Sequence, residues 1–481
     1  MQSRMEVWSF AEVGSSLVPV RVEVGLMKGL ADIQMMGLPD QALKESLLRV
    51  KSAIKNQGFT LPNAHKVLVN LKPTHQKKGG RGIELAIAMA ILIETGQIPI
   101  EEKDKIFAYG QLGLKGEVNF LNEVNWLPVE EDLFIWSGQP RDSIDRKLKV
   151  LRQLSDLHGE CEHWEASDLE KLERPAFTSM KFTKSQAELL KILAHGGHHT
   201  MLSGPAGSGK STLAYALHSL LPEPESDEIR EIRKWNDYFD RPAGAWRPLQ
   251  SPHHTATAQA LLGGGNPPEP GEITRAHGGI LLLDEFLEFP TRLREGLREP
   301  LERLEVRISR RGHSEILPAK FQLIATSNFC PCGDFVPKKH QPSCRFSRNK
   351  CQSYLERLSG PLADRFDILA YSQNWNEEQS YGSEEIYKHI LSAQSFQKEL
   401  RGQTESNGRL SWNQLLASLE RPTHLTYLPE AGRSKRRHMA ILRVARSLAD
   451  LDEKEKIEIS HIRRALDYSW RPFESLRESF L

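Results

Sequence analysis

The sequence predicts an α/β protein whose central part is a doubly wound, mostly parallel sheet. A glycine-rich loop at 204–209 lies between a short apolar run at 199–203 and a helix-like run that starts at Thr212. Further apolar runs alternate with loops and helix-like segments from about 176 to 372, which is the order of elements in such sheets. The 481 residues suggest about three domains.

The composition is that of an ordinary globular chain. Charged residues make up 26% and the net charge is +1, so any binding of nucleic acid must depend on local patches. The longest apolar run, Leu85–Ile93, is too short to span a bilayer, and we expect no membrane partner. The first six residues lack the apolar core of a signal peptide, and the chain has five cysteines. We therefore expect a reducing, cytoplasmic location.

The first predicted domain covers residues 1–170, and a polar linker follows at 172–175. Asp40 could cap its first helix, and Gly58 follows the end of that helix. Its strand-like runs are 18–24 and 66–71, and its helix-like runs are 40–56 and 83–95.

Two further domains are predicted. The α/β core covers 176–372 and contains a cysteine-rich insert at 330–351. Residues 380–481 are mostly helical, and their last helix-like segment runs from 456 to 466.

The segment Gly204–Ser211 reads GPAGSGKS and fits G-x-x-x-x-G-K-[ST], the pattern of a phosphate-binding loop. Its glycines allow a tight turn that aims backbone N–H groups at phosphates. Lys210 would reach the β- and γ-phosphates of ATP, and Ser211 would bind Mg²⁺. A glycine-rich turn without a ligand is the alternative. The predicted nucleotide-binding residues of this segment are Gly204, Pro205, Ala206, Gly207, Ser208, Gly209, Lys210, Ser211 and Thr212.

Two carboxylates follow a second buried strand. The apolar run 280–283 ends in Asp284 and Glu285, and open α/β sheets bind ligands at the carboxyl ends of their strands. Asp284 would hold Mg²⁺ together with Ser211, and Glu285 would polarise the attacking water. An acidic turn is the alternative for a lone Asp-Glu pair, but the upstream glycine-rich loop favours the catalytic interpretation.

Two polar residues further along are candidates for completing the site. Asn328 follows a strand-like run at 321–327 and could sense the γ-phosphate, although an asparagine there is often only a turn former. Arg365 could project into the site of a neighbouring subunit, where an arginine finger stabilises charge in the transition state. A surface ion pair with Asp364 or Asp367 is the alternative for Arg365.

A basic run opens a helix in the third domain. Arg436 is the candidate that would contact phosphates from this helix, and Lys435 and Arg437 compete with it. A solvated basic face is the remaining interpretation.

Together these motifs resemble the AAA+ ATPases and, more narrowly, the magnesium-chelatase-like ComM/YifB family. The matching segments, which extend over nearly the whole chain, are 37–40, 69–71, 247–248, 251–256, 261–265, 270–273, 276–277, 330–333, 359–362 and 441–451. The resemblance implies a Lon-protease-like N-terminal domain, an AAA+ core and a C-terminal helical lid. It also implies a homo-oligomeric, hexameric ring that moves branched or single-stranded DNA with ATP.

The chain departs from the family in two places. Phe329 stands where members usually carry proline. No serine lies between Pro73 and Gly110, where Lon proteases place their nucleophile, so we expect no proteolysis. The basic residues Lys77, Lys78 and Arg81 could bind DNA, or they could form a solvated charge cluster.

Four of the five cysteines fall within one window rich in Pro, Gly and Lys. Cys330, Cys332, Cys344 and Cys351 could bind Zn²⁺, although their spacing is irregular. A disulfide and unliganded thiols are the alternatives, and the expected reducing location weighs against the disulfide.

A hairpin is predicted over 302–313, with Arg310 and Arg311 near its tip. Those arginines could face a central pore and grip DNA phosphates in a salt-sensitive manner. The insert at 263–270 could be a second pore loop. Ordinary exposed loops are the alternative for both.

The function favoured by these observations is an ATP-hydrolysing ring motor. The resemblance makes it a DNA helicase that promotes branch migration during recombination or uptake of DNA. One alternative is a magnesium-chelatase-type ATPase that remodels a protein or porphyrin system. The presence of the Lon-protease-like N-terminal domain makes this alternative less favourable. A second alternative is a nucleotide-gated scaffold. Such a scaffold would not need a catalytic carboxylate, so the presence of Lys210, Glu285 and Arg365 makes it less favourable.

Overall fold

The computed structural model describes most of residues 6–469. The gaps are 14–15, 31, 37–40, 74–80, 99–104, 131–132, 141–143, 145, 160, 167–170, 243, 266–268, 311–312, 334–344, 359, 373–377, 379 and 429–434. Asp40, the predicted helix cap, lies in one of them.

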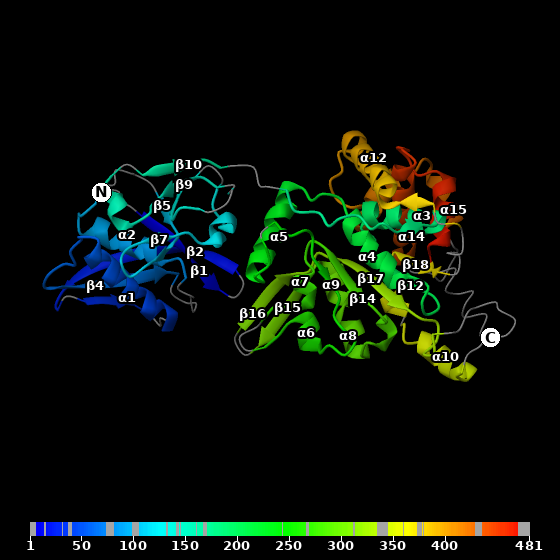
Figure 1. Cartoon of the computed structure of the whole chain (residues 1–481), viewed down its shortest axis with the longest axis horizontal. Coiled ribbons are helices and arrows are strands. Elements are labelled where there is room, and N and C mark those ends of the chain that lie inside the picture. The colour runs from blue at the N-terminus through cyan, green and yellow to red at the C-terminus, as the bar shows by residue number, and fades with distance from the viewer. Residues whose placement is uncertain are drawn as a thin grey trace. The chain divides into compact units, whose positions relative to one another are not determined.

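The chain divides into two compact units, each described by itself below (Figure 1). The first contains residues 1–171 and 229–243, and the second contains 172–228 and 244–481. The sheet and the C-terminal helices thus belong to the same unit. The predicted division of that unit near 372–380 stays a prediction.

Within the described residues, the first unit is built on an eight-stranded mixed sheet of order β10-β9-β8-β5-β1-β2-β4-β3. The strand-like runs 18–24 and 66–71 lie in β2 and β4, and the helix-like runs form α1 and α2, so these predictions are confirmed. The elements of this unit are β1 (Glu6–Val13), β2 (Ser16–Lys28), β3 (Asp32–Met35), α1 (Gln41–Asn56), β4 (His65–Lys72), α2 (Glu84–Glu94), β5 (Lys105–Ala108), β6 (Gln111–Leu112), β7 (Val118–Asn119), β8 (Ile135–Ser137), β9 (Leu148–Val150) and β10 (Glu162–Trp164).

Helix α2 is buried over most of its length, which explains why its sequence is apolar on all sides. Its first residue, Glu84, is fully buried and is satisfied by three neighbours. Ser46 Oγ and Arg49 Nε each donate to its carboxylate at 2.8 Å, and the backbone N–H of Leu112 donates at 2.7 Å. Because a buried carboxylate is tolerated only when it is paired, this cluster fixes α1 against α2.

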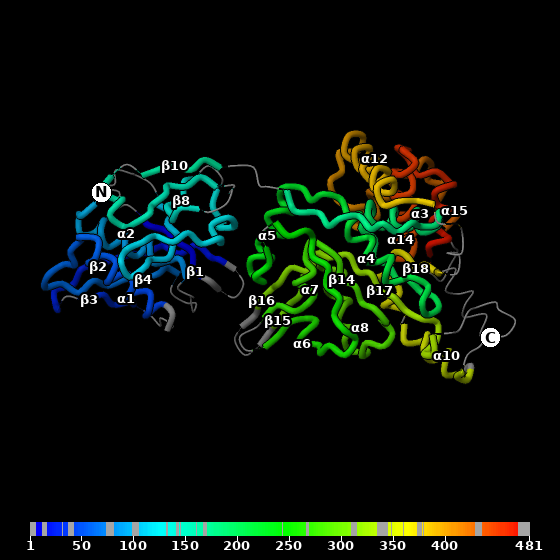
Figure 2. Tube along the Cα trace, viewed as in Figure 1, coloured from blue at the N-terminus to red at the C-terminus, as the bar shows by residue number. Residues whose placement is uncertain are grey.

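The second unit contains, in its described part, a five-stranded parallel sheet of order β13-β14-β17-β12-β18. The course of β14, β17 and β18 can be followed in Figure 2. This parallel sheet confirms the predicted α/β class of the core. The strands are β12 (Thr200–Ser203), β13 (Leu249–Gln250), β14 (Ile280–Leu283), β17 (Gln322–Ser327) and β18 (Ile368–Tyr371). The strands β12, β14 and β17 are buried along their whole length, as expected for a sheet covered on both faces.

The helices α3, α4, α12, α13, α14 and α15 share one hydrophobic core with this sheet. The helices α12, α14 and α15 gather beside α3 (Figure 1). The main helices of this unit are α3 (Lys184–Gly196), α4 (Lys210–Leu220), α6 (Ala258–Leu262), α7 (Glu272–Arg275), α8 (Thr291–Gly296), α9 (Arg298–Arg303), α10 (Arg348–Leu355), α11 (Gly360–Ala363), α12 (Ser383–Arg401), α13 (Trp412–Ala417), α14 (Lys435–Leu451) and α15 (Ile459–Asp467). Helix α5 (Ser226–Tyr238) starts in this unit, but its residues from 229 onward belong to the first unit. None of the described helices is long and apolar enough to cross a membrane.

The predicted hairpin is confirmed as β15 (Glu305–Arg310) and β16 (His313–Pro318), which pair antiparallel. A two-stranded pair, β11 (Lys181–Phe182) with β19 (Tyr381–Gly382), joins the start of the unit to the start of α12. Helix α3 follows β11 with a capping box, in which Thr183 and Gln186 satisfy each other's backbone N–H groups.

A buried carboxylate joins the helices to one another. Asp450, on α14, is fully buried and accepts hydrogen bonds from Asn407 Nδ2 at 2.7 Å and Arg401 Nη2 at 2.8 Å. His195 Nε2 of α3 lies 3.0 Å from that same oxygen, Oδ2, and the other oxygen, Oδ1, accepts from Arg446 Nη2 at 2.9 Å. Burial alone would raise the pKa of Asp450, but His195 and Arg446 outweigh it and lower that pKa. The carboxylate is thus charged and paired.

We predict that Asp450→Asn lowers the free energy of unfolding by about 3 kcal/mol, because it leaves the buried Arg446 without its counter-charge. Denaturant unfolding of the full chain, followed by circular dichroism, would measure this loss. The control is Asp452→Asn, which removes a half-exposed partner of Arg464 and should cost less than about 1 kcal/mol. Equal midpoints for the two variants would contradict the assigned role of Asp450.

Candidate nucleotide site

Three predicted motifs meet at one edge of the parallel sheet. β14, β17 and β12 are neighbours, and they run in the same direction. Asp284, Asn328 and Gly204 directly follow these strands, so all three lie at the carboxyl edge. This is the edge at which open α/β sheets bind ligands.

The phosphate-binding loop has the backbone that its glycines predict. Gly207 and Gly209 have φ angles of 74° and 81°, which a residue with a Cβ rarely adopts. Helix α4 begins directly afterwards at Lys210, so Ser211 and Thr212 lie in its first turn. The N–H groups of such a turn are not used within the helix and attract anions.

Lys210 folds back over this loop. Its Nζ donates to the carbonyl oxygens of Pro205 at 2.8 Å and Gly204 at 3.1 Å, and to Asn328 Oδ1 at 3.2 Å. Burial lowers the pKa of Lys210, and the charges of Asp284 and Glu285 oppose this effect. The predicted phosphate ligand and the predicted sensor are therefore in direct contact.

The segments after β17 and β18 hold the loop in place. Ser372 Oγ donates to Ser208 Oγ at 2.8 Å, and a Cβ at Gly204 would lie only 1.7 Å from Ser372 Oγ. On the other side, Ala206 N donates to Gly333 O at 2.9 Å. The contact of the turn at 330–333 with the phosphate-binding loop is made by backbone atoms, so no side-chain pattern in the sequence indicates it.

Asp284 lies between two hydroxyl groups. Ser211 Oγ donates to Asp284 Oδ1 at 2.9 Å, and Thr326 Oγ1 donates to the same oxygen. The Thr326 hydroxyl in turn accepts the backbone N–H of Glu285 at 3.1 Å. Carboxylate and hydroxyl oxygens in contact suit Mg²⁺, so Ser211 and Asp284 could hold the ion as predicted. Thr326 was missed because only the pairing of β14 with β17 brings it to Asp284.

Glu285 projects from a strained position. Its φ is 54°, in the left-handed region, and its side chain is half exposed. Its carboxylate Oε2 lies 3.5 Å from His254 Nδ1. An accessible carboxylate beside the Asp284 oxygens is suitable for polarising a water molecule.

Arg365 and Arg436 meet at one carboxylate. Arg436 Nη2 lies 2.6 Å from Glu302 Oε1, and Arg365 Nη2 donates to the same oxygen. Arg365 Nη1 also donates to Pro361 O at 2.7 Å. In the described part of the chain, no hydrogen bond or ion pair joins either arginine to the phosphate-binding loop. The alternative ion pair of Arg365 with Asp364 or Asp367 is replaced by one with Glu302.

The two competitors of Arg436 have other partners. Arg437 is buried and donates to the carbonyl oxygens of Phe366 and Asp367, both at 2.9 Å. The Lys435 ammonium lies 5.1 Å from the centre of the Trp412 ring. Lys435 and Arg436 are both exposed, whereas Arg437 is buried, so the role of Arg436 toward a ligand stays a prediction.

The cysteines are only partly described. Cys330 Sγ and Cys332 Sγ lie 2.7 Å apart, and Cys351 is buried on α10. Cys344 lies outside the described residues. Among the residues that are described, no three or more His, Cys, Asp or Glu side chains form a group that could hold a metal ion. Zinc binding stays a prediction.

Most of the candidate DNA contacts lie outside the described residues. Lys77, Lys78 and Arg311 are in gaps, and the side chain of Arg310 is not described either. Arg81 is exposed. In the 263–270 insert, whose residues 266–268 are in a gap, Gly264 and Glu269 form an antiparallel bridge.

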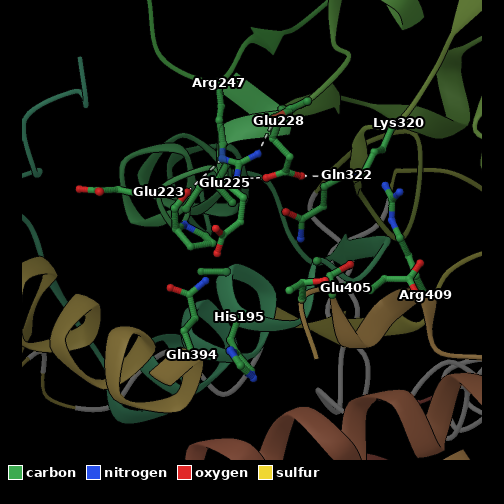
Figure 3. Close-up of a pocket in the computed structure, with 18 of the residues that line it drawn as sticks. His195, Glu223, Glu225, Glu228, Arg247, Lys320, Gln322, Gln394, Glu405 and Arg409 are labelled. Atoms are coloured by element: carbon green, nitrogen blue, oxygen red, sulfur yellow. Dashed lines mark hydrogen bonds and ion pairs between the residues drawn. The ribbon is translucent and has the colours of Figure 1, made fainter. Parts of the chain in front are cut away.

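A separate cavity of about 190 Å³ lies where β14 and β17 begin, at the edge of the sheet opposite the nucleotide site (Figure 3). Its lining includes Glu228, whose carboxylate lies 2.8 Å from Arg247 Nη2 and 3.2 Å from Lys320 Nζ. Burial alone would raise the pKa of Glu228, but these two cations outweigh it and hold that pKa at about 2. The charge of Glu228 is therefore paired with those of Arg247 and Lys320.

We predict that Thr326→Val raises the Mg²⁺ concentration for half-maximal ATP hydrolysis about tenfold, because Asp284 loses the hydroxyl that orients it. Nucleotide binding without Mg²⁺ should not change. Titration of Mg²⁺ at fixed ATP would measure the effect. Thr326→Ser keeps the hydroxyl and serves as the control. A valine variant with the same Mg²⁺ requirement as the serine variant would refute the role of Thr326.

Three family models match this chain. "Magnesium chelatase, subunit ChlI" matches residues 176–380, "Subunit ChlI of Mg-chelatase" matches 22–129, and "Magnesium chelatase, subunit ChlI C-terminal" matches 380–469. The first of them contains the whole nucleotide site.

The chain is also similar to individual proteins over nearly its whole length. The chain is 32% identical to the uncharacterized protein YifB of Escherichia coli, over 95% of each chain. It is 31% identical to the competence protein ComM of Haemophilus influenzae, over 96% of each chain. A shorter match, 34% identical over 101 residues, covers 21% of this chain and 10% of the DNA replication licensing factor mcm2 of Xenopus tropicalis. The chain belongs to the magnesium-chelatase-like family of AAA+ ATPases that includes YifB and ComM.

Proposed function

We propose that this protein is an ATP-driven ring motor of the cytoplasm that acts as a helicase and promotes branch migration of DNA. The observation that carries the ATPase part is the contact of Lys210 with Asn328 and of Ser211 with Asp284 at one edge of the sheet. A remodelling ATPase is the coarser function that the family supports. The DNA substrate and the helicase activity are the proposal.

The residues at this edge would divide the chemistry among them. Lys210 and the N–H groups of the loop bind the phosphates of ATP, and Ser211 and Asp284 hold the Mg²⁺ ion that accompanies it. Glu285 polarises the attacking water, and Asn328 orients the γ-phosphate. The ion neutralises charge on the phosphate oxygens when it is bound.

A ring of identical subunits, with six members, would explain Arg365 and Arg436. Both arginines have partners away from the phosphate-binding loop of their own chain, and both meet at Glu302. In a ring, Arg365 could reach the nucleotide of the neighbouring subunit, and Arg436 could contact phosphates from the helical lid. An arginine supplied from another chain can raise the rate by about 10³–10⁵.

DNA is the proposed substrate for two reasons. One similar protein is named a competence protein, and another is named a DNA replication licensing factor. The strands β15 and β16 pair as a hairpin, which supports the proposal that Arg310 and Arg311 contact phosphates in a central pore together with the loop at 263–270. The first unit would be a Lon-protease-like domain without proteolytic activity, and its Lys77, Lys78 and Arg81 could also touch DNA. The helices after 380 would form the lid.

ATP hydrolysis by the pure protein, with and without a four-way DNA junction, would test this proposal. We expect the junction to accelerate hydrolysis and its arms to exchange in the same reaction. Linear duplex DNA of the same length and composition is the control for simple charge attraction. Hydrolysis that no DNA changes would overturn the DNA proposal and would favour a remodelling ATPase with another substrate.

The variant Glu285→Gln separates a motor from a nucleotide-gated scaffold. The glutamine variant should bind ATP and assemble, but it should not hydrolyse ATP or exchange the arms of the junction. A variant that exchanges the arms at the wild-type rate would contradict the motor.

A separate prediction concerns zinc binding by the four clustered cysteines. Cys330 and Cys332 have adjacent thiols and Cys351 is buried, so we propose that these residues and Cys344 bind Zn²⁺ and stiffen the turn that contacts Ala206. Metal analysis of the pure protein should find about one zinc per chain, and the double variant C330S/C332S should lose it. A wild-type protein with far less than one zinc per chain would refute the site.

A further inference from the structure

We propose that His254 is a positioning residue that orients the Glu285 carboxylate and links that carboxylate, through helix α6 and Gly263, to the hairpin strand β15. This inference rests on the proposed role of Glu285 in polarising water. It assigns a function to the segment 251–256, which the sequence analysis used only for the family resemblance.

The first observation is that two contacts join His254 to the segment around Glu285. His254 Nδ1 lies 3.5 Å from Glu285 Oε2, close enough for a hydrogen bond after a small rotation of either side chain. The imidazole also stands edge-on to the Phe289 ring, with centroids 6.4 Å apart and an interplanar angle of 80°. Phe289 is buried and follows the single turn at 286–288 that begins after Glu285. The imidazole is therefore held beside the carboxylate by a fixed ring.

The second observation is that Glu285 has few constraints of its own. Its side chain is half exposed, whereas the neighbouring Asp284 carboxylate is held by Ser211 and Thr326. A carboxylate used as a general base must point one lone pair at the water that it polarises. A donor at one oxygen therefore decides where the other oxygen points, and His254 is in position to supply that donor.

The third observation is a continuous path from His254 to the hairpin. The segment leads into α6, which Thr257 caps by accepting the N–H of Ala260 at 3.1 Å. Helix α6 ends at Leu262, and a Cβ on the next residue, Gly263, would lie 2.7 Å from Ile308 Cδ1 of β15. A displacement of the hairpin by a bound ligand would therefore reach α6 and His254 through packed atoms.

His253 offers a matched comparison in the same segment. Its ring lies against His254, with centroids 4.1 Å apart, but its Nδ1 contacts Thr255 Oγ1 at 2.8 Å within the segment itself. A substitution there removes the same kind of side chain without removing the neighbour of Glu285.

Steady-state ATP hydrolysis by the full-length variants H254A, H254N and H253A would test the inference. We expect H254A to lower kcat about tenfold with the KM for ATP unchanged, because it affects the general base and not the phosphate ligands. H254N should recover most of the rate, since its amide nitrogen can take the place of Nδ1. H253A should be affected much less than H254A. Where DNA stimulates the wild type, H254A should also reduce that stimulation.

Three results would overturn the inference. These are a wild-type kcat for H254A, equal losses in H254A and H254N, and equal losses in H254A and H253A. Binding of a fluorescent ATP analogue confirms that each variant retains its nucleotide site. The variant Glu285→Gln distinguishes the role of His254 from the role of Glu285. A glutamine variant that still hydrolyses ATP refutes the role of Glu285 itself. An inactive glutamine variant beside a fully active H254A refutes only the role of His254.

Discussion

The register between β14 and β17 is the constraint on which the nucleotide site depends. Leu283 pairs with Ala325, so the residues that follow, Asp284 and Thr326, lie side by side and share a hydrogen bond. A shift of one residue would turn Thr326 to the other face of the sheet and leave Asp284 with Ser211 alone. Because both strands are completely buried, such a shift would also place polar groups in the core. The apolar core therefore fixes the geometry of the proposed Mg²⁺ ligands.

Helix α14 is attached to the sheet at several points along its length. Arg437 binds the carbonyl oxygens before β18, and Arg443 Nη1 lies 3.4 Å from Asp367 Oδ1. One turn further, His198 Nε2 lies 2.8 Å from Ser447 Oγ. Burial alone would raise the pKa of Asp367, but His198 and Arg443 outweigh it and hold that pKa at about 2. These contacts fix the start of α14 beside the segment that carries Arg365, so the proposed arginine finger and the proposed lid contact, Arg436, belong to one connected part of the fold.

The elements of the core could be predicted because burial imposes a simple pattern. The apolar runs before Gly204, Asp284 and Asn328 became strands, and the pattern of glycines gave the correct position of the loop before α4. The partners of long polar side chains could not be predicted in the same way. Arg365 pairs with Glu302, which is distant in sequence, and not with the adjacent Asp364 or Asp367. The distance in sequence between two charged residues says little about whether they form an ion pair, because the fold of the chain between them decides which side chains come into contact.

The sequence by itself determined the class of the core, the phosphate-binding loop and the identity of its acidic pair, since these depend on local patterns of apolar, glycine and charged residues. Only the tertiary structure decided which residues from other segments contact the loop and the acidic pair. Thr326 reaches Asp284 through strand pairing, Gly333 meets Ala206 through backbone atoms, and His254 approaches Glu285 from a loop. Each of these contacts joins segments that are separate in the chain, and packing, rather than any local pattern, brings such segments together.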